Sequence, residues 1–146
     1  MFYTIGEVSK KYNLPLSTLR YYDNEGLIPN LEKDAKGNRK FSENNLEALK
    51  VIECLKKSGL EIKEIKKFME WTQEGNKSFT KRKNLFLERK EIVEQEIEQL
   101  NRVLNMLKFK CWYYEEAIKY NDEGKVKNIK LEEMPKEIKK AYENTL

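Results

Sequence analysis

The most informative absence in this chain is histidine, because none occurs among its 146 residues. Histidine is the commonest general base in enzymes and the commonest transition-metal ligand in proteins. Its absence removes most of the support for an enzyme or a metal centre. The sequence also has no glycine-rich phosphate loop and no GxSxG or HExxH motif. We therefore expect a protein that is not an enzyme and has no cofactor and no bound metal.

Cysteine and long apolar runs are also scarce. The only cysteines are Cys54 and Cys111, and without CxxC spacing they are expected to be free thiols. No stretch approaches the roughly 20 consecutive apolar residues of a membrane span. The opening MFYTIGEVSKK lacks the apolar core of a secretory signal. These features predict a cytoplasmic protein that does not contact membranes.

Charge of both signs is abundant and nearly balanced. The chain has 29 Lys and Arg against 25 Asp and Glu, which gives a net charge of +4. Such a balance does not establish nucleic-acid binding, which requires basic and aromatic groups to converge on one surface. The length fits one compact domain, or a small domain with one long appended element.

The N-terminal residues carry the pattern of two short helices joined by a tight turn. Thr4 and Glu7 have the spacing of a capping box at the start of a helix over residues 5–12. Asn13 suits the left-handed conformation that ends a helix. Pro15 favours the start of a second helix immediately afterwards. Together these signals predict a helix-turn-helix.

In this motif the second helix enters the major groove and reads base edges, while flanking donors hold phosphates. We expect Ser17, Thr18 and Arg20 to face DNA. Tyr21 and Tyr22 offer hydroxyl groups that can contact phosphate without adding charge. Taken singly, each residue is better explained as a solvated or half-buried side chain, but the set beside this turn favours DNA binding.

The segment NLEKDAKGNRKF, residues 30–41, follows the second helix. Its extended ends and basic turn predict a small β-hairpin, or wing, that lies along the DNA backbone. Lys36, Arg39 and Lys40 are its candidate phosphate contacts. A solvated loop is the alternative, but the position directly after the second helix favours a wing.

The stretch YTIGEVSKKYNLPLSTLRYYDNEGLIP, with Gly37 and Arg39 of the wing, resembles the DNA-binding domain of the MerR family of bacterial transcription regulators. Asn38 departs from the family, where tyrosine is common. The resemblance implies a mainly α-helical, winged helix-turn-helix domain over residues 1–75. The side chains expected at DNA are Thr4, Ser17, Thr18, Arg20, Tyr21, Tyr22, Lys36, Arg39 and Lys40.

Residues 42–57 and 61–71 have the apolar spacing of two further helices, and the first contains Cys54. Lys50 and Lys57 share its helix face, and nearby positive charge favours a reactive thiolate. IECLKKSGLEIKEIKKFMEW and KCWYYEEAI also resemble the family branch that responds to carbonyl electrophiles, in which a cysteine at this position is the proposed sensor. A buried, inert Cys54 is the alternative.

A single long helix is predicted over residues 80–118, within a segment spanning 76–120. Apolar residues recur in heptads along it and form a coiled-coil seam. The seam residues are Phe86, Val93, Ile97, Leu100, Leu104, Leu107 and Cys111. So long a helix needs a partner helix, and a second copy of the chain is the simplest source. In the resembling family the two helices run antiparallel. Residues 121–146 form a short tail with one further helix over about 135–142.

The resemblance also implies a mechanism. Such homodimers bind a near-palindromic promoter spacer and present it to RNA polymerase by distorting the DNA. We expect an activator that responds to electrophile stress through Cys54. A non-covalent effector near Trp112, Tyr113 and Tyr114 is an alternative, although these aromatics more simply seal a dimer interface. An architectural DNA-binding protein without an effector and a ligand-sequestering helical scaffold are the remaining alternatives.

Overall fold

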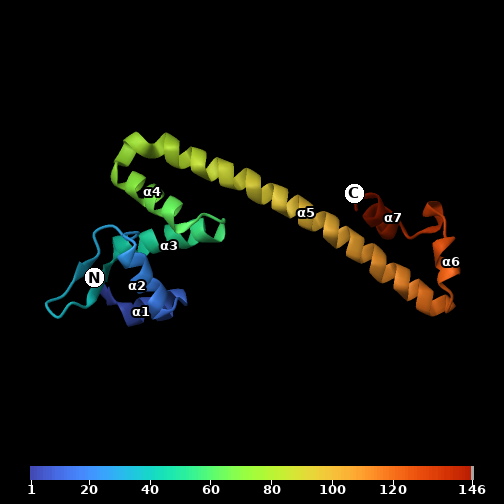
Figure 1. Cartoon of the computed structure of the whole chain (residues 1–146), viewed down its shortest axis with the longest axis horizontal. Coiled ribbons are helices and arrows are strands. Elements are labelled where there is room, and N and C mark those ends of the chain that lie inside the picture. Colours follow the sequence, from blue (N-terminus) through green and yellow to red (C-terminus); the bar gives the residue numbers. More distant parts are fainter. Residues whose placement is uncertain (146) are drawn as a thin grey trace. The chain divides into compact units, whose positions relative to one another are not determined.

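A computed structural model describes residues 1–145 of the chain. It contains two compact units, Met1–Arg89 and a second that begins at Lys90. Figure 1 labels the helices of both. We call them the first unit and the second unit. No helix within residues 1–145 combines the length and apolar character needed to cross a bilayer.

The first unit is the predicted winged helix-turn-helix, followed by the start of the long helix. Two short helices come first, and a three-stranded antiparallel sheet in the order β1-β3-β2 flanks them. Its elements are β1 (Phe2–Thr4), α1 (Ile5–Tyr12), α2 (Leu16–Asn24), β2 (Glu32–Lys33), β3 (Arg39–Ser42), α3 (Glu43–Lys57), α4 (Ile62–Gln73), a 3₁₀ turn (Gly75–Ser78) and the beginning of α5 (Phe79–Tyr120).

Side-chain caps fix where these helices begin. The Thr4 hydroxyl accepts a hydrogen bond from the Glu7 amide at 3.2 Å, and the Glu7 carboxylate accepts one from the Thr4 amide at 2.7 Å. This is the predicted capping box. Asn13 takes the expected left-handed conformation, with φ 52°, and ends α1 in the tight turn. Ser42 caps α3 in a similar reciprocal pair with Asn45.

The sheet has one more strand than the predicted hairpin. β1 pairs with β3, which places Tyr3 opposite Phe41, and β2 pairs with β3 on its other edge. A three-residue strand is too short to leave a period-two pattern, so β1 could not be predicted from the sequence. Because β1 leads directly into α1, the pairing fixes the wing beside the helix-turn-helix.

The core of the first unit lies where α2, α3, α4 and β3 meet. Leu19, Phe41, Leu49, Ile52 and Ile65 are completely buried there. The start of α5 also belongs to this unit, since the rings of Phe86 and Phe68 meet edge to face at 5.3 Å. The expected division after residue 75 marks a change of element, whereas the packing continues to Arg89.

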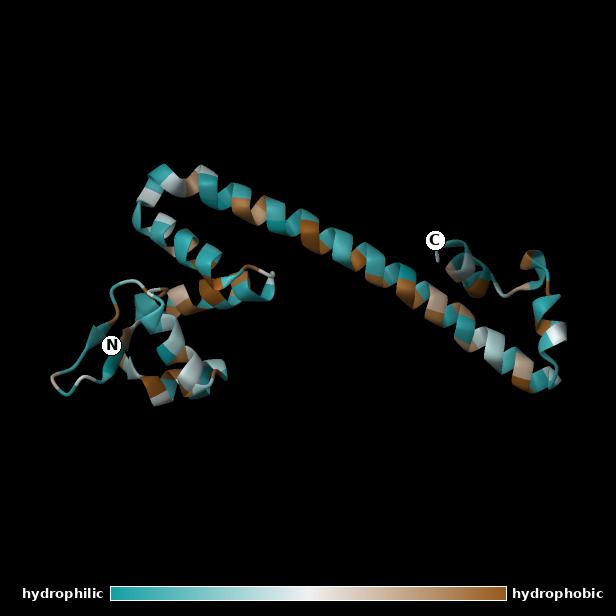
Figure 2. Ribbon diagram, in the orientation of Figure 1, coloured by the Kyte–Doolittle hydropathy of each residue, from teal (hydrophilic) through white to brown (hydrophobic). Residues whose placement is uncertain are grey.

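The second unit contains the rest of α5, then α6 (Glu123–Lys127), a 3₁₀ turn (Leu131–Glu133) and α7 (Lys136–Glu143). α7 packs back on α5, with Ala141 buried and the ring of Tyr142 lying 4.8 Å from that of Phe109. The predicted final helix is confirmed as α7, whereas α6 was not predicted. Figure 2 shows hydrophobic positions recurring along the whole of α5.

Candidate nucleic-acid interface

Helical periodicity divides α2 into a core face and an outer face. Leu19 and Tyr22, three residues apart, are buried to 0% and 1% exposure. Ser17, Arg20 and Tyr21 lie at i, i+3 and i+4 and are exposed. The outer face therefore presents a hydroxyl, a guanidinium and a phenol together. Thr18 lies at the edge of this face and is half-buried.

A surface hollow of about 320 Å³ joins α2, the wing and β1. It brings together four of the predicted DNA-contacting residues, which are Thr4, Arg20, Arg39 and Lys40. Ser17, Thr18, Tyr21, Tyr22 and Lys36 lie outside its lining. Side chains distant in sequence thus form one continuous surface.

Arg39 ties the wing to the end of α2. Its Nε donates to Asp23 Oδ2 at 2.7 Å, and its Nη2 donates to Asn24 Oδ1 at 3.4 Å. Both members of the Arg39–Asp23 ion pair are mostly buried, with side-chain exposures of 17% and 19%. The guanidinium is thus already hydrogen-bonded to side chains at the end of α2. Its geometry points to positioning the wing against α2 in addition to any contact with phosphate.

The tip of the wing is closed by Asp34. Its carboxylate accepts hydrogen bonds from the Lys36 amide at 2.9 Å and from the Asn38 amide at 2.8 Å. These bonds, with the Asn38 amide first, hold the pKa of Asp34 below its usual range. The Asn38 side chain adds a third bond to Asp34, which gives this departure from the resembling family a structural role. Lys36 is left exposed at the turn.

Tyr22 does not belong to the exposed surface. Its hydroxyl donates to Glu53 Oε1 at 2.6 Å and accepts from Lys56 Nζ at 3.1 Å, so it joins α2 to α3. Burial, together with this bond to Glu53, raises the pKa of Tyr22 well above its ordinary value. Because the residue is only 1% exposed, Tyr22 supports the outer face of α2 from beneath and is not part of the exposed surface.

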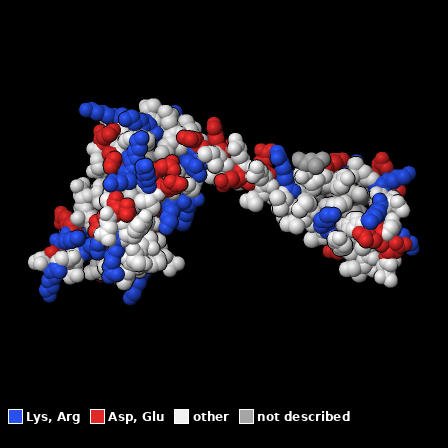
Figure 3. All heavy atoms as spheres, in the orientation of Figure 1, with Lys and Arg blue, Asp and Glu red and all other residues white. Residues whose placement is uncertain are grey.

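The charges around the hollow are unevenly compensated. Arg39 pairs with Asp23, while Lys40 lies 3.9 Å from Glu32 and its ammonium lies 4.3 Å from the centre of the Phe2 ring. Among the ion pairs of residues 1–145, none involves Arg20 or Lys36. Figure 3 shows lysine and arginine side chains projecting from the first unit. Of the four basic residues predicted to contact DNA, Arg20 and Lys36 therefore have the least internal competition for a phosphate.

Cys54 is exposed on α3 rather than buried in the core. It lines a hollow of about 460 Å³ with Tyr12, Lys50, Glu53 and Lys57. Both lysines expected beside the thiol are present there. Lys50 also pairs with Glu47 at 2.6 Å, which offsets part of its charge.

The predicted seam is largely exposed in the single chain. Ile97, Leu100, Leu104 and Leu107 have exposures of 52%, 68%, 48% and 51%. Cys111 is exposed as well, and Val93 is half-buried. Phe86 differs from the others because one side of its ring packs on Phe68 of α4. Periodicity alone did not separate this role from that of a seam residue.

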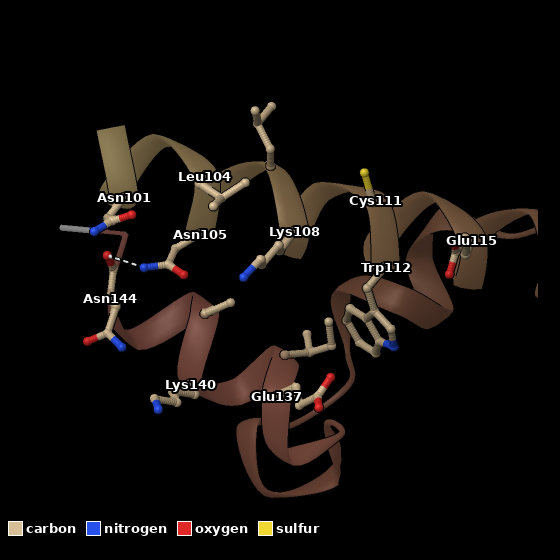
Figure 4. Close-up of a pocket in the computed structure, with 13 residues that line it drawn as sticks. Asn101, Leu104, Asn105, Lys108, Cys111, Trp112, Glu115, Glu137, Lys140 and Asn144 are labelled. Atoms are coloured by element: carbon tan, nitrogen blue, oxygen red, sulfur yellow. Dashed lines mark hydrogen bonds between the residues drawn. The ribbon is translucent and has the colours of Figure 1, made fainter. Parts of the chain in front are cut away.

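A cavity of about 900 Å³ lies between α5 and α7 within the second unit. Figure 4 shows Trp112 and Leu104 at its border, and the Asn105 amide donating to the Asn144 carbonyl, a bond of 3.5 Å. Lys108 and Glu137 give its lining both signs of charge. Of the predicted aromatic cluster, Trp112 lines this cavity, whereas Tyr113 and Tyr114 lie outside its lining. Within residues 1–145, no grouping of three or more Cys, Asp or Glu side chains is suited to hold a metal ion.

This fold and surface define a winged helix-turn-helix DNA-binding protein with a long carboxy-terminal helix. Residues 3–71 match the family described as MerR HTH family regulatory protein. Residues 46–108 match the family described as MerR, DNA binding. The chain belongs to the MerR family of DNA-binding transcription regulators.

Similar proteins support the same family. An uncharacterized HTH-type transcriptional regulator of Haemophilus influenzae is 36% identical over 135 residues, which cover 92% of this chain and 98% of that protein. The structure of HiNmlR, a MerR family regulator lacking the sensor domain, was solved bound to promoter DNA. It is 36% identical to this chain, with a TM-score of 0.72, and the match covers 88% of this chain and 100% of that chain.

A MerR family regulator from Bacillus thuringiensis is 39% identical, with a TM-score of 0.67 and coverage of 76% of this chain and 97% of that chain. All three relatives are named as transcription regulators, which fits a role other than catalysis.

Proposed function

We propose that this chain acts as a homodimer that binds a near-palindromic promoter spacer and switches transcription by distorting the DNA for RNA polymerase. The observation that carries the proposal is the continuous surface formed by the outer face of α2, the wing and β1. The promoter DNA bound by HiNmlR, which this chain matches over 88% of its length, supports the same role.

At the DNA, Ser17, Arg20 and Tyr21 reach into the major groove from the outer face of α2. Thr4, Lys36 and Lys40 contact phosphates from the flanking β1 and wing. Lys66 of α4 adds a further candidate phosphate contact, because its Cε lies within 3.7 Å of where a side chain on Gly26 would begin, just after α2. Phosphate contacts from both sides of α2 fix its register in the groove.

A second copy of the chain covers the seam of α5. Four aliphatic side chains with about half or more of their surface in solvent are a poor fit to a monomer but suit a coiled coil. An antiparallel pair, as in the resembling family, gives two reading helices related by a two-fold axis. That symmetry requires a near-palindromic site.

The effector that we propose is a carbonyl or related electrophile that reacts at Cys54. An exposed thiol beside Lys50 and Lys57 supports this assignment. Alkylation by iodoacetamide, followed by peptide mass spectrometry, tests it in the native dimer. We expect Cys54 to react several times faster than Cys111, and Cys54→Ser to abolish the transcriptional response. Equal rates, or a response that survives in Cys54→Ser, would contradict the assignment.

The cavity beside Trp112 favours a second candidate, a non-covalent small-molecule effector. In this case the response survives Cys54→Ser and is lost when Ala141→Trp fills the cavity. A purely architectural protein would bend DNA in the same way with and without any effector and in both variants.

Selection of duplexes from a randomised library tests the DNA-binding proposal itself. The wild-type chain should enrich a near-palindrome, and Arg20→Ala should lose most of its affinity for that duplex. Lys119→Ala, at the other end of α5, is the matched control and should bind as the wild type does. Enrichment of no sequence, or equal binding by Arg20→Ala, would leave the helical scaffold as the better account.

A further inference from the structure

Arg89 is the last residue of the first unit and joins α5 to the end of α3. We propose that it is a positioning residue that fixes the direction in which α5 leaves the DNA-binding unit, and so the spacing of the two reading helices in the dimer. This inference rests on the proposed function, because spacing matters only to a dimer that binds two half-sites.

The contact is a fork of two hydrogen bonds to one oxygen. Arg89 Nε donates to the Ser58 carbonyl at 2.9 Å, and Arg89 Nη2 donates to the same oxygen. Ser58 is the C-cap of α3, where carbonyl groups have no partner within the helix and carry partial negative charge. The guanidinium therefore caps α3 from a helix that begins much later in the sequence.

Gly59 leaves room for this fork. Its φ is 94°, and a Cβ at this position would lie 2.5 Å from Arg89 Nη2. Any side chain here would be strained and would displace the guanidinium. The local backbone thus suits both the turn after α3 and the approach of Arg89.

Earlier contacts of α5 leave Arg89 as a second, separate polar anchor of this helix. Arg82 Nη2 donates to the Gly75 carbonyl at 2.8 Å and Arg82 Nε to the Ser78 hydroxyl at 3.0 Å, which anchors the first turn of α5. Phe86 packs on Phe68 one turn later. Arg89, a further turn along, provides the second polar anchor. Without Arg89, these contacts of α5 would be confined to Arg82 and Phe86 in its first two turns, whereas Arg89 extends them by a further turn. α5 runs unbroken from Phe79 to Tyr120, so the same helix carries both polar anchors and the seam.

Half-site spacing is the readout that tests this role. The selected duplex is compared with versions that have one base pair added to or removed from its centre, which changes the half-site rotation by about 35°. Wild type should prefer the selected spacing at least tenfold. Arg89→Ala should reduce this preference to about twofold, and Arg89→Lys, with one donor group, should restore part of it. Arg102→Ala removes an arginine paired only with Glu98 on the same helix and should keep the full preference. An unchanged preference in Arg89→Ala would overturn the proposal.

A DNA-free measurement separates this inference from the proposed function. Nitroxide labels on Asn44→Cys and Glu88→Cys, in a Cys54→Ser, Cys111→Ser background diluted with unlabelled chains, report the distance from α3 to α5. Arg89→Ala should widen or shift this distance distribution, whereas Arg102→Ala should not. An unaltered distribution would refute the positioning role even if no duplex were selected, while a widened one would stand independently of DNA binding.

Discussion

The two units of the chain differ in how far they bury their apolar residues. The first unit encloses Leu19, Leu49 and Ile65 completely and closes its helix ends with the Thr4 and Ser42 capping boxes. The second unit leaves Leu100 68% exposed and Ile118 79% exposed. The first unit therefore has its own buried core, whereas the second exposes apolar side chains that the proposed partner helix would cover.

A charge placed in the seam should have the largest effect on the second unit. Leu100→Asp should raise the dissociation constant of the dimer about 100-fold or more, because a buried, unpaired carboxylate is costly. The first unit should remain folded. Sedimentation velocity gives the association state and near-ultraviolet circular dichroism the fold. Gln99→Asp adds the same charge beside the seam and is the control. A dimer that survives Leu100→Asp would show that the seam lies elsewhere.

Arg20→Ala should affect function without affecting either unit. Arg20 is exposed and forms no ion pair within residues 1–145, so its removal should leave stability and dimerisation unchanged. Loss of a base or phosphate contact should weaken specific binding by about 1–3 kcal/mol, or roughly fivefold to 150-fold. Fluorescence anisotropy with the selected duplex measures this at fixed salt. Binding within twofold of wild type would remove Arg20 from the interface.

Tyr22→Phe separates a core tyrosine from one that contacts DNA. Loss of the bond to Glu53 should lower the free energy of unfolding by about 1 kcal/mol, with DNA affinity nearly unchanged. A raised pKa means that the unfolded chain releases this proton first. The contribution of the Tyr22 hydroxyl to the free energy of unfolding should therefore be fully present below pH 10, the ordinary pKa of tyrosine. It should decline as the pH rises above that value. Denaturant titrations should show a weaker alkaline decline in Tyr22→Phe. A tenfold loss of DNA affinity in this variant would instead indicate direct contact.

Asp34→Asn should have the smallest effect, confined to the wing. The lowered pKa of Asp34 shows that its hydrogen bonds favour the charged form, so their contribution is present at neutral pH and disappears as the pH falls through the folded-state pKa. We expect DNA affinity to fall about threefold, as for a single exposed contact, with little change in melting temperature. Calorimetry and anisotropy measure the two quantities. A large drop in melting temperature would mean that the wing is part of the core.

Local signals in the sequence predicted much of the fold. The Thr4 and Glu7 spacing, the left-handed Asn13 and the Ser42 cap each act over a few residues, and each is confirmed. β1 was missed because its pairing with β3 depends on tertiary contact. The burial of Tyr22 was missed because its partner Glu53 lies on another helix. Arg89 left no signal either, since one arginine among many charges becomes distinctive only where it meets Ser58.

Hydroxyl-radical footprinting of the selected duplex tests the central claim most directly. Two reading helices joined through α5 should protect two segments on one face of the duplex, related by the symmetry of the site. Both should disappear together in Leu100→Asp at concentrations where the wild type is dimeric. A single protected segment, or one that Leu100→Asp leaves intact, would contradict a regulator that reads DNA as a dimer.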